Sequence, residues 1–200
     1  MNLLIDWAFS HKVELGGTLF GLIYVWFSIR QSLYTWPAGI ITSLLYCWVF
    51  FEANFYAMMG LQIYYFFISI YGWWSWRNGG QSGSESKPLQ ISRTSASLWI
   101  IILSLSVILS LLLYILLSGY SNSPIPFGEA FTTALSIIAT WMLARKKIEH
   151  WFIWIFVDLI SAGLYLQQGL YPTVFLFLAY AAMAGLGYYE WQKEPFKVQC

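Results

Sequence analysis

The sequence predicts an all-α integral membrane protein with seven transmembrane helices, arranged as two groups of three joined by one extra helix. Three observations predict it. Hydrophobic residues make up 59% of the 200 residues and charged residues only 10%, with a mean hydropathy of +0.62, which leaves too little polar surface for a water-soluble domain. Seven apolar stretches are long enough to cross about 30 Å of hydrocarbon as helices. Finally, the first and last parts of the chain match each other at a constant spacing.

The predicted spans are separated by short polar or proline-containing segments. Pro37, Pro126 and Pro172 each stand where a span opens, a position that tolerates the missing N–H, and no proline interrupts a span. We expect no cleavable signal ahead of the first span. The seven predicted spans cover residues 13–30, 36–52, 55–76, 96–118, 126–144, 150–168 and 170–191.

The ten lysine and arginine residues predict the orientation of the chain. With seven spans, Lys12 alone falls on the side of the N-terminus, and the other nine fall on the opposite side. Because basic residues are retained on the cytoplasmic side of a membrane, we expect the N-terminus outside and the C-terminus in the cytoplasm.

The two outer parts of the chain form an internal repeat. Residues 14–76 align with residues 129–191 without a gap at an offset of 115, and 13 of the 63 positions are identical, many of them rare residues such as Trp76 and Trp191. Three spans is an odd number, so direct fusion would invert the second unit, and a fourth span restores its direction. The sequence therefore predicts a 3+1+3 parallel repeat, a SWEET-like arrangement with a ligand at the repeat interface near the midplane. A duplicated scaffold that transports nothing is the other interpretation.

This repeat predicts three regions in the chain. Residues 1–77 form the first three-span repeat, residues 78–125 form a linker and the connecting fourth span, and residues 126–200 form the second repeat with a cytoplasmic tail. Residues 78–94 are the one extended polar stretch, and their Gly and Ser content predicts a flexible linker.

Asp158 is the one acidic residue near the centre of a span, where an ionised carboxylate costs about 2.5–3.5 kcal/mol. Steps of three and four along the helix place it on one face with Trp151, Trp154, Ser161 and Tyr165. A carboxylate among aromatic rings suits a permanently cationic aromatic ligand, through ion pairing, stacking and cation–π contact. The other interpretation is a structural Asp158 that bonds a neighbouring hydroxyl or amide.

A second polar and aromatic face is predicted in the third span. Gln62, Tyr65 and Ser69 follow the same three-four spacing, and Gln62 offers both a donor and an acceptor at membrane depth. A helix–helix hydrogen bond would explain Gln62 equally well. Tyr180 in the seventh span lies close to mid-depth and faces either the ligand or the core.

Several other chemistries are excluded or disfavoured. His11 and His150 stand at span ends with no second ligand nearby, so we expect no metal site, and neither lies at the depth of Asp158 to serve as a catalytic base. The GxxxxGK[ST] pattern of ATP hydrolysis is absent. A net charge of +1 argues against nucleic acid, and two cysteines, Cys47 and Cys200, predict no disulfide framework. We expect neither an enzyme nor a bound cofactor.

Short motifs spread along nearly the whole chain, apart from the linker and the fourth span, resemble one family. They are E-x-x-G-T from 14 to 18, L-Q followed by S-I-Y-G-W-W-x-W between 61 and 76, L-S-I-I-A from 135 to 139, A-R-K-K-I-E-H-W from 144 to 151, W-x-x-x-D-L-I-S from 154 to 161 and G-L-Y from 169 to 171. In this order they resemble the Pnu family of bacterial vitamin transporters.

The resemblance implies an inner-membrane protein that carries nicotinamide riboside, thiamine or riboflavin by facilitated diffusion, often as a homotrimer, while a separate cytoplasmic kinase traps the product. Riboside carriers of the family tend to have glutamine at the position of Gln62 but asparagine at those of Ser69 and Asp158. That departure favours a thiamine-type member, whose ligand joins an aminopyrimidine to a charged thiazolium. We therefore expect a thiamine uniporter that works by alternating access. A nicotinamide riboside uniporter and a SWEET-like sugar carrier stay as alternatives.

Overall fold

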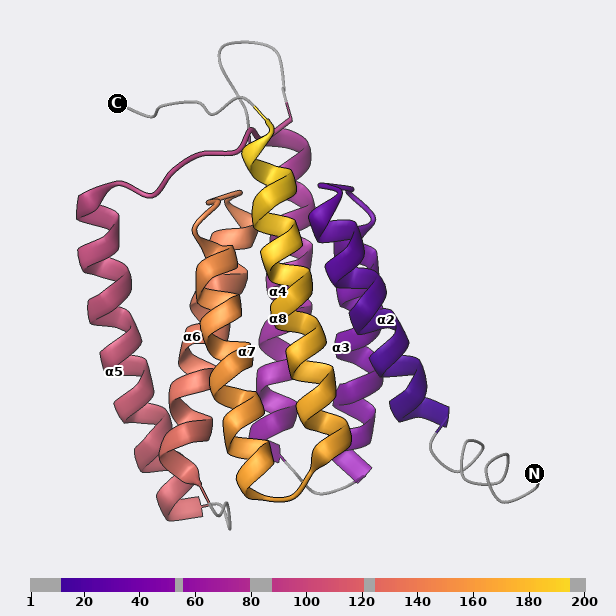
Figure 1. Cartoon of the computed structure of the whole chain (residues 1–200), viewed down its shortest axis with the longest axis vertical. Coiled ribbons are helices and arrows are strands. Elements are labelled where there is room, and N and C mark those ends of the chain that lie inside the picture. The colour runs from indigo at the N-terminus through magenta and orange to yellow at the C-terminus, as the bar shows by residue number, and fades with distance from the viewer. Residues whose placement is uncertain (1–11, 53–55, 80–87, 121–124, 195–200) are drawn as a thin grey trace.

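The computed structural model describes residues 12–52, 56–79, 88–120 and 125–194, and within them the chain is helical almost throughout. Each helix agrees with a predicted span to within about two residues at either end. The seven helices are α2 (Lys12–Ile29), α3 (Thr35–Glu52), α4 (Tyr56–Asn78), α5 (Ala96–Tyr120), α6 (Pro126–Ala144), α7 (His150–Gln167) and α8 (Tyr171–Gln192). The predicted all-α fold class is confirmed, and Figure 1 shows the helices side by side in one bundle.

Four of these helices, α5 to α8, are long and apolar enough by themselves to cross a membrane. The three before them fall short of that standard within the described residues. In α2 the apolar stretch Thr18–Ile29 is shorter than a span. Helices α3 and α4 carry tyrosines and tryptophans, which hydropathy scales rank as weakly polar although such rings are common at membrane interfaces.

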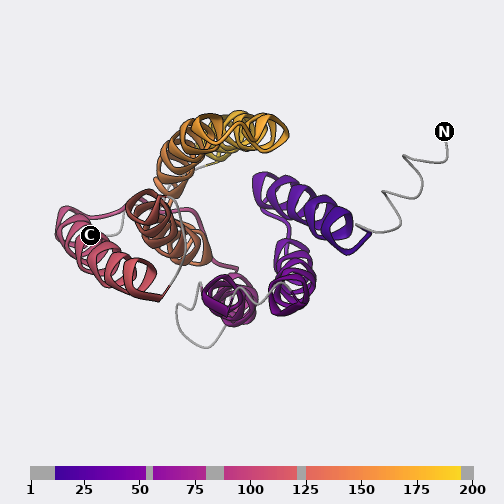
Figure 2. The ribbon, with the colours of Figure 1, turned by 90° about the horizontal axis from the view of Figure 1, so that it is seen from below.

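Six helices form a closed ring, and the seventh stands outside it. Around the ring α2 packs on α3, α3 on α4, α4 on α6, α6 on α7, α7 on α8, and α8 returns to α2. Figure 2 shows this ring end-on, with α5 beside α6 only. The ring has two seams where the first three helices meet the last three, one between α4 and α6 and one between α2 and α8.

Two of the hydrogen bonds that cross between the two halves are equivalent under the offset of 115. The Trp76 indole N–H donates to the carbonyl oxygen of Leu143 at 3.1 Å, and the Trp191 indole N–H donates to that of Ser28 at 3.0 Å. Each tryptophan therefore bonds the half to which it does not belong. This reciprocal pair of hydrogen bonds supports the predicted parallel repeat. The division of the chain into three regions stays a prediction.

The turns after α2 and α6 are a second equivalent pair. Gln31 and Lys146 both adopt positive φ, 52° and 49°, and the Lys146 ammonium donates to Gln31 Oε1 at 3.2 Å. The same ammonium lies 4.5 Å from the centre of the Trp76 ring, an attractive cation–π arrangement. Burial lowers the pKa of Lys146 to about 8. We call the end of the bundle that carries these turns the basic end.

Four tryptophans pack against one another near the basic end, and we call them the tryptophan cluster: Trp36, Trp76, Trp151 and Trp191. All four are at most 3% exposed. Trp36 meets Trp76 edge to face at 5.1 Å, Trp151 meets Trp191 at 5.6 Å, and Trp76 meets Trp191 at 6.1 Å across the two halves. Edge-to-face pairs add stability beyond the area that they bury, so the cluster holds this end of the ring together.

Part of the predicted flexible linker is tied to the basic end of the bundle. The Ser92 N–H donates to the Lys146 carbonyl at 3.0 Å, and the Ile148 N–H donates to the Ser92 carbonyl at 3.1 Å. The Thr94 N–H and hydroxyl both donate to the Glu149 carboxylate. Ile91, 3% exposed, belongs to the same buried group as the tryptophan cluster. Residues 88–95 therefore form an ordered strap, and residues 80–87 lie outside the described residues.

Candidate binding cavity

A cavity of about 260 Å³ lies inside the ring, between its two halves. All six ring helices contribute to its wall, and α5 contributes none of its lining residues. The wall combines aromatic and aliphatic side chains with serine, threonine, glutamine, histidine and aspartate. A cavity in which polar groups converge among apolar rings is typical of a small-molecule binding site.

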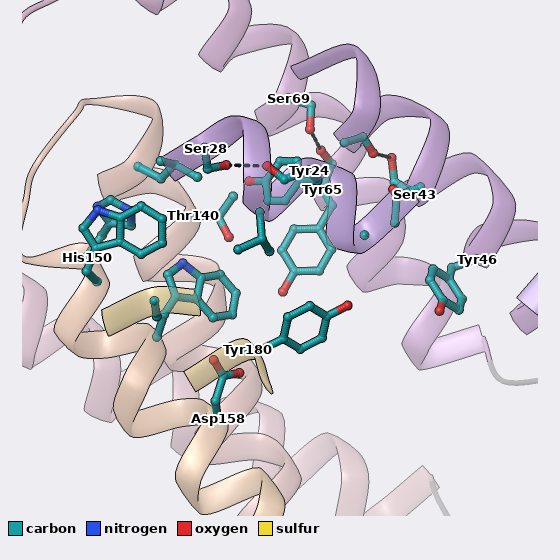
Figure 3. Close-up of a pocket in the computed structure, with 18 of the residues that line it drawn as sticks. Tyr24, Ser28, Ser43, Tyr46, Tyr65, Ser69, Thr140, His150, Asp158 and Tyr180 are labelled. Carbon is teal, nitrogen blue, oxygen red and sulfur yellow. Dashed lines mark hydrogen bonds between the residues drawn. The ribbon is translucent and has the colours of Figure 1, made fainter. Parts of the chain in front are cut away.

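Asp158 is the acidic residue of this cavity. Its side chain is 4% exposed, and Figure 3 shows its carboxylate at the cavity beside Tyr180. Among the described residues no hydrogen bond or ion pair joins that carboxylate. Because an ionised group buried without a partner is costly, a cationic ligand would suit this carboxylate.

Aromatic rings line the cavity that contains this carboxylate. Trp151 and Trp154 precede it on α7, and Tyr65 and Tyr180 reach the cavity from α4 and α8. Trp151 is held in place because its ring lies where a β-carbon on Gly187 would stand. Rings on several sides of a carboxylate can stack on a flat cationic ligand and attract its charge through their faces.

Five serine and threonine hydroxyls of the cavity donate their protons to the backbone of their own helices. Each donates to the backbone carbonyl four residues earlier, at 2.7–2.9 Å. These residues are Ser28, Thr42, Ser43, Ser69 and Thr140. A hydroxyl has one proton and two lone pairs, so these oxygens are left to accept hydrogen bonds from a ligand. These five hydroxyls therefore offer acceptors, while the tyrosine hydroxyls, the Gln62 amide and the indole N–H groups of the same wall can also donate.

His150, the first residue of α7, also lines the cavity and is fully buried. Its Nδ1 lies 2.7 Å from the Lys147 carbonyl oxygen. Its Nε2 has no partner, and neither has the indole N–H of Trp151. Two buried polar atoms without partners beside a cavity mark places where a ligand can form hydrogen bonds.

Seven of the nine residues predicted to bind substrate line the cavity: Gln62, Tyr65, Ser69, Trp151, Trp154, Asp158 and Tyr180. Ser161 and Tyr165 are not among the lining residues. Ser161 is buried one turn beyond Asp158, and Tyr165 stacks on Phe177 of α8 at 5.3 Å. The three-four spacing selects one face of α7 over its whole length, whereas beyond Asp158 that face packs against α8.

Sequence reasoning missed much of the wall, and above all the contribution of α2 and α3. Those two helices have no acidic or basic residue in their described middle turns to draw attention, and most of their cavity side chains are tyrosines and small hydroxyls. A histidine at the end of a span, such as His150, gives no sequence signal of a binding site. The residues missed are Gly21, Tyr24, Val25, Ser28, Gly39, Thr42, Ser43, Tyr46, Thr140, Leu143, His150, Phe177 and Ala184.

Comparison with known proteins places the chain in a family. The sequence model of a family described as nicotinamide mononucleotide transporter matches residues 11–193. The nicotinamide riboside transporter PnuC of Escherichia coli (strain K12) is 25% identical over 197 residues, covering 86% of this chain and 82% of that protein. The riboflavin/roseoflavin transporter RibM of Streptomyces davaonensis is 27% identical over 179 residues, covering 89% of this chain and 83% of that protein.

A solved structure supports the fold independently. The crystal structure of the vitamin B3 transporter PnuC has a TM-score of 0.73 to this chain at 19% identity, covering 96% of this chain and 85% of that one. At that identity the similarity concerns the fold alone. Together with the match of the family model over most of the sequence, it establishes that this chain belongs to the Pnu family, a family of membrane transporters.

Proposed function

We propose that the protein is a uniporter for thiamine in the bacterial inner membrane. The observation that carries the proposal is the Asp158 carboxylate, buried and unpaired in an aromatic cavity. Thiamine is a permanent cation with two flat rings, so its charge can pair with Asp158 while its rings lie against Trp151, Trp154 and Tyr180. Its amino and hydroxyl groups supply donors for the five cavity hydroxyls that are left to accept.

Two other ligands are suggested by relatives of the chain. Riboflavin, named for the RibM relative, is neutral and would leave Asp158 without a partner. Nicotinamide riboside, named for the PnuC relatives, is also an aromatic cation and is therefore the main rival of thiamine. Ser69 and Asp158 stand where the riboside carriers of the family tend to have asparagine, and this difference favours thiamine. A sugar is neutral and, like riboflavin, would leave the charge of Asp158 unpaired.

The proposed mechanism is alternating access without ion coupling. One three-helix group would rock against the other about the seams, exposing the cavity to one side at a time. With the basic end in the cytoplasm and the N-terminus outside, a monovalent cation that enters gains about 2.3 kcal/mol per 100 mV of membrane potential. A separate kinase would then retain the product. A homotrimer of such uniporters is part of the proposal.

Competition for uptake tests the ligand. Purified protein is reconstituted in liposomes, and uptake of labelled thiamine is measured with an excess of unlabelled thiamine, nicotinamide riboside, riboflavin or glucose. We expect thiamine to compete fully and the other three weakly. Full competition by the riboside, with failure of thiamine itself to compete, would replace the proposed ligand by its rival. Absence of counterflow with every compound would reject transport.

The role of Asp158 is tested by Asp158→Asn, which keeps the shape of the side chain and removes its charge. Loss of a buried charge partner costs about 2 kcal/mol or more, so we expect thiamine to bind about 30-fold more weakly. The control is Glu190→Gln, which removes an exposed carboxylate paired only with Lys193 at 2.8 Å. Equal affinities of Asp158→Asn and the wild-type protein, by calorimetry, would return Asp158 to a structural role.

A further inference from the structure

One end of the cavity carries polar groups that the pairing of a cation with Asp158 does not use. His150, Ser28 and Thr140 line this end, and Figure 3 shows them together, away from Asp158. His150 precedes Asp158 by eight residues on α7, which corresponds to about 12 Å along the helix axis. The two side chains can therefore contact different parts of one ligand.

The hydrogen bonds at this end determine what a ligand must offer. His150 Nδ1 lies 2.7 Å from the Lys147 carbonyl oxygen, which only accepts, so Nδ1 carries the ring proton. Nε2 of the neutral ring is then an acceptor, and it is fully buried without a partner. Ser28 and Thr140 donate their protons to backbone carbonyls at 2.8 Å. All three side chains at this end of the cavity therefore have acceptor capacity left for a ligand.

We infer that His150 is a specificity-determining residue, whose Nε2 accepts a hydrogen bond from a hydroxyl group of the transported vitamin. In thiamine this is the hydroxyl of the hydroxyethyl group on the charged ring. Asp158 then pairs with the positive charge, and His150 accepts the hydrogen bond of the terminal hydroxyl. The inference rests on the proposed function, because it assumes that the ligand is thiamine. It assigns to His150 a role in selecting vitamins that carry a free hydroxyl.

The test compares two ligands on matched variants. Affinities for thiamine and for its analogue with an ethyl group in place of the hydroxyethyl are measured by calorimetry on detergent-solubilised protein. A buried acceptor left without its donor weakens binding, so we expect the wild-type protein to prefer thiamine by about tenfold. In His150→Asn the amide nitrogen still donates to the Lys147 carbonyl while the Nε2 acceptor is lost, and the preference should fall to about one.

The repeat supplies a matched control. Thr35 precedes His150 by the offset of 115, is equally buried, and also has a polar atom without a partner, but it is not among the cavity residues. Thr35→Val should keep the tenfold preference. In His150→Gln an amide takes the position of Nε2 but the Lys147 carbonyl loses its donor, so the preference should fall to between about one and ten. If His150→Asn does not fold, an unchanged tenfold preference in His150→Gln overturns the inference.

The outcomes separate the inference from the proposed function. Binding of thiamine without any preference for the hydroxyl in the wild-type protein overturns the inference and leaves the proposed ligand standing. A preference that persists in folded His150→Asn also overturns it, because Ser28 and Thr140 would then be the acceptors. If the wild-type protein binds neither compound, the proposed ligand fails, and the assignment to His150 fails with it.

Discussion

Two glycines decide where two tryptophans of the cluster can lie. The ring of Trp36 occupies the place that a β-carbon on Gly72 would take, and the ring of Trp151 does the same at Gly187. Both pairs match at the offset of 115, yet only Trp151 lines the cavity. The Trp36–Gly72 contact therefore contributes to stability alone, whereas the Trp151–Gly187 contact contributes both to stability and to the shape of the cavity.

Gly72→Ala and Gly187→Ala test this difference. Each added methyl group must displace an indole ring, and overpacking of this kind costs about 1–3 kcal/mol, so both variants should melt at lower temperature than the wild-type protein. Only Gly187→Ala should also weaken binding of thiamine, because it moves a cavity ring. Melting curves and calorimetry on both variants check this, and an equal loss of affinity in the two would contradict it.

A single site residue can be predicted from the sequence where placing its side chain inside a membrane span costs free energy. Asp158 was identified because a carboxylate in the middle of a span needs a reason, and the cavity contains it. Ser28 and Thr140 could not be identified, because a hydroxyl that donates to its own helix is common in membrane helices. His150 became a candidate only once the structure gave its Nδ1 a partner and left Nε2 without one.

At the scale of elements, the helix bounds were predictable and the strap was not. Long apolar runs and prolines at their first turns fix where the spans begin and end. The strap, residues 88–95, is polar in sequence, and its order comes from contacts with the turn between α6 and α7, more than 50 residues later in the chain. No local pattern predicts a contact of that separation.

Glu149→Ala tests how far the strap stabilises the protein. The carboxylate of Glu149 accepts from the Thr94 N–H and, at 2.8 Å, from the Thr94 hydroxyl. Hydrogen bonds to a charged group contribute about 1.5–3 kcal/mol when buried, and partial exposure of this pair reduces that to about 1 kcal/mol. We expect a lower melting temperature and faster proteolysis within the linker, both measured in detergent. Glu190→Ala, which loses an exposed i,i+3 pair, should change neither.

At the scale of the whole molecule, the ring is closed most firmly at the basic end. The tryptophan cluster, the Lys146–Gln31 hydrogen bond and the strap all lie there. The two hydrogen bonds donated by the Trp76 and Trp191 indoles, together with the Lys146–Gln31 bond, join one half of the ring to the other. If the two halves rock against each other, opening toward the basic end must break these bonds. The repeat could be predicted from sequence, but the partners of its tryptophans could not, because they are backbone carbonyls of the opposite half.

Trp76→Phe and Trp191→Phe test this closure, since each removes one cross-half hydrogen bond and keeps an aromatic ring. The reporter is Ser28→Cys, a cavity position 2% exposed, in a background with Cys47→Ala and Cys200→Ser. A net hydrogen bond contributes about 1 kcal/mol, so either Phe substitution should speed modification by a membrane-impermeant thiol reagent, added on the side of the basic end, by about fivefold. The double Phe variant should be modified faster still, and saturating thiamine should slow the modification.

The control is Trp48→Phe, at an exposed position on α3, which should leave the rate of modification unchanged. Unchanged labelling in the double variant would mean that the halves separate elsewhere and that these indoles serve only stability.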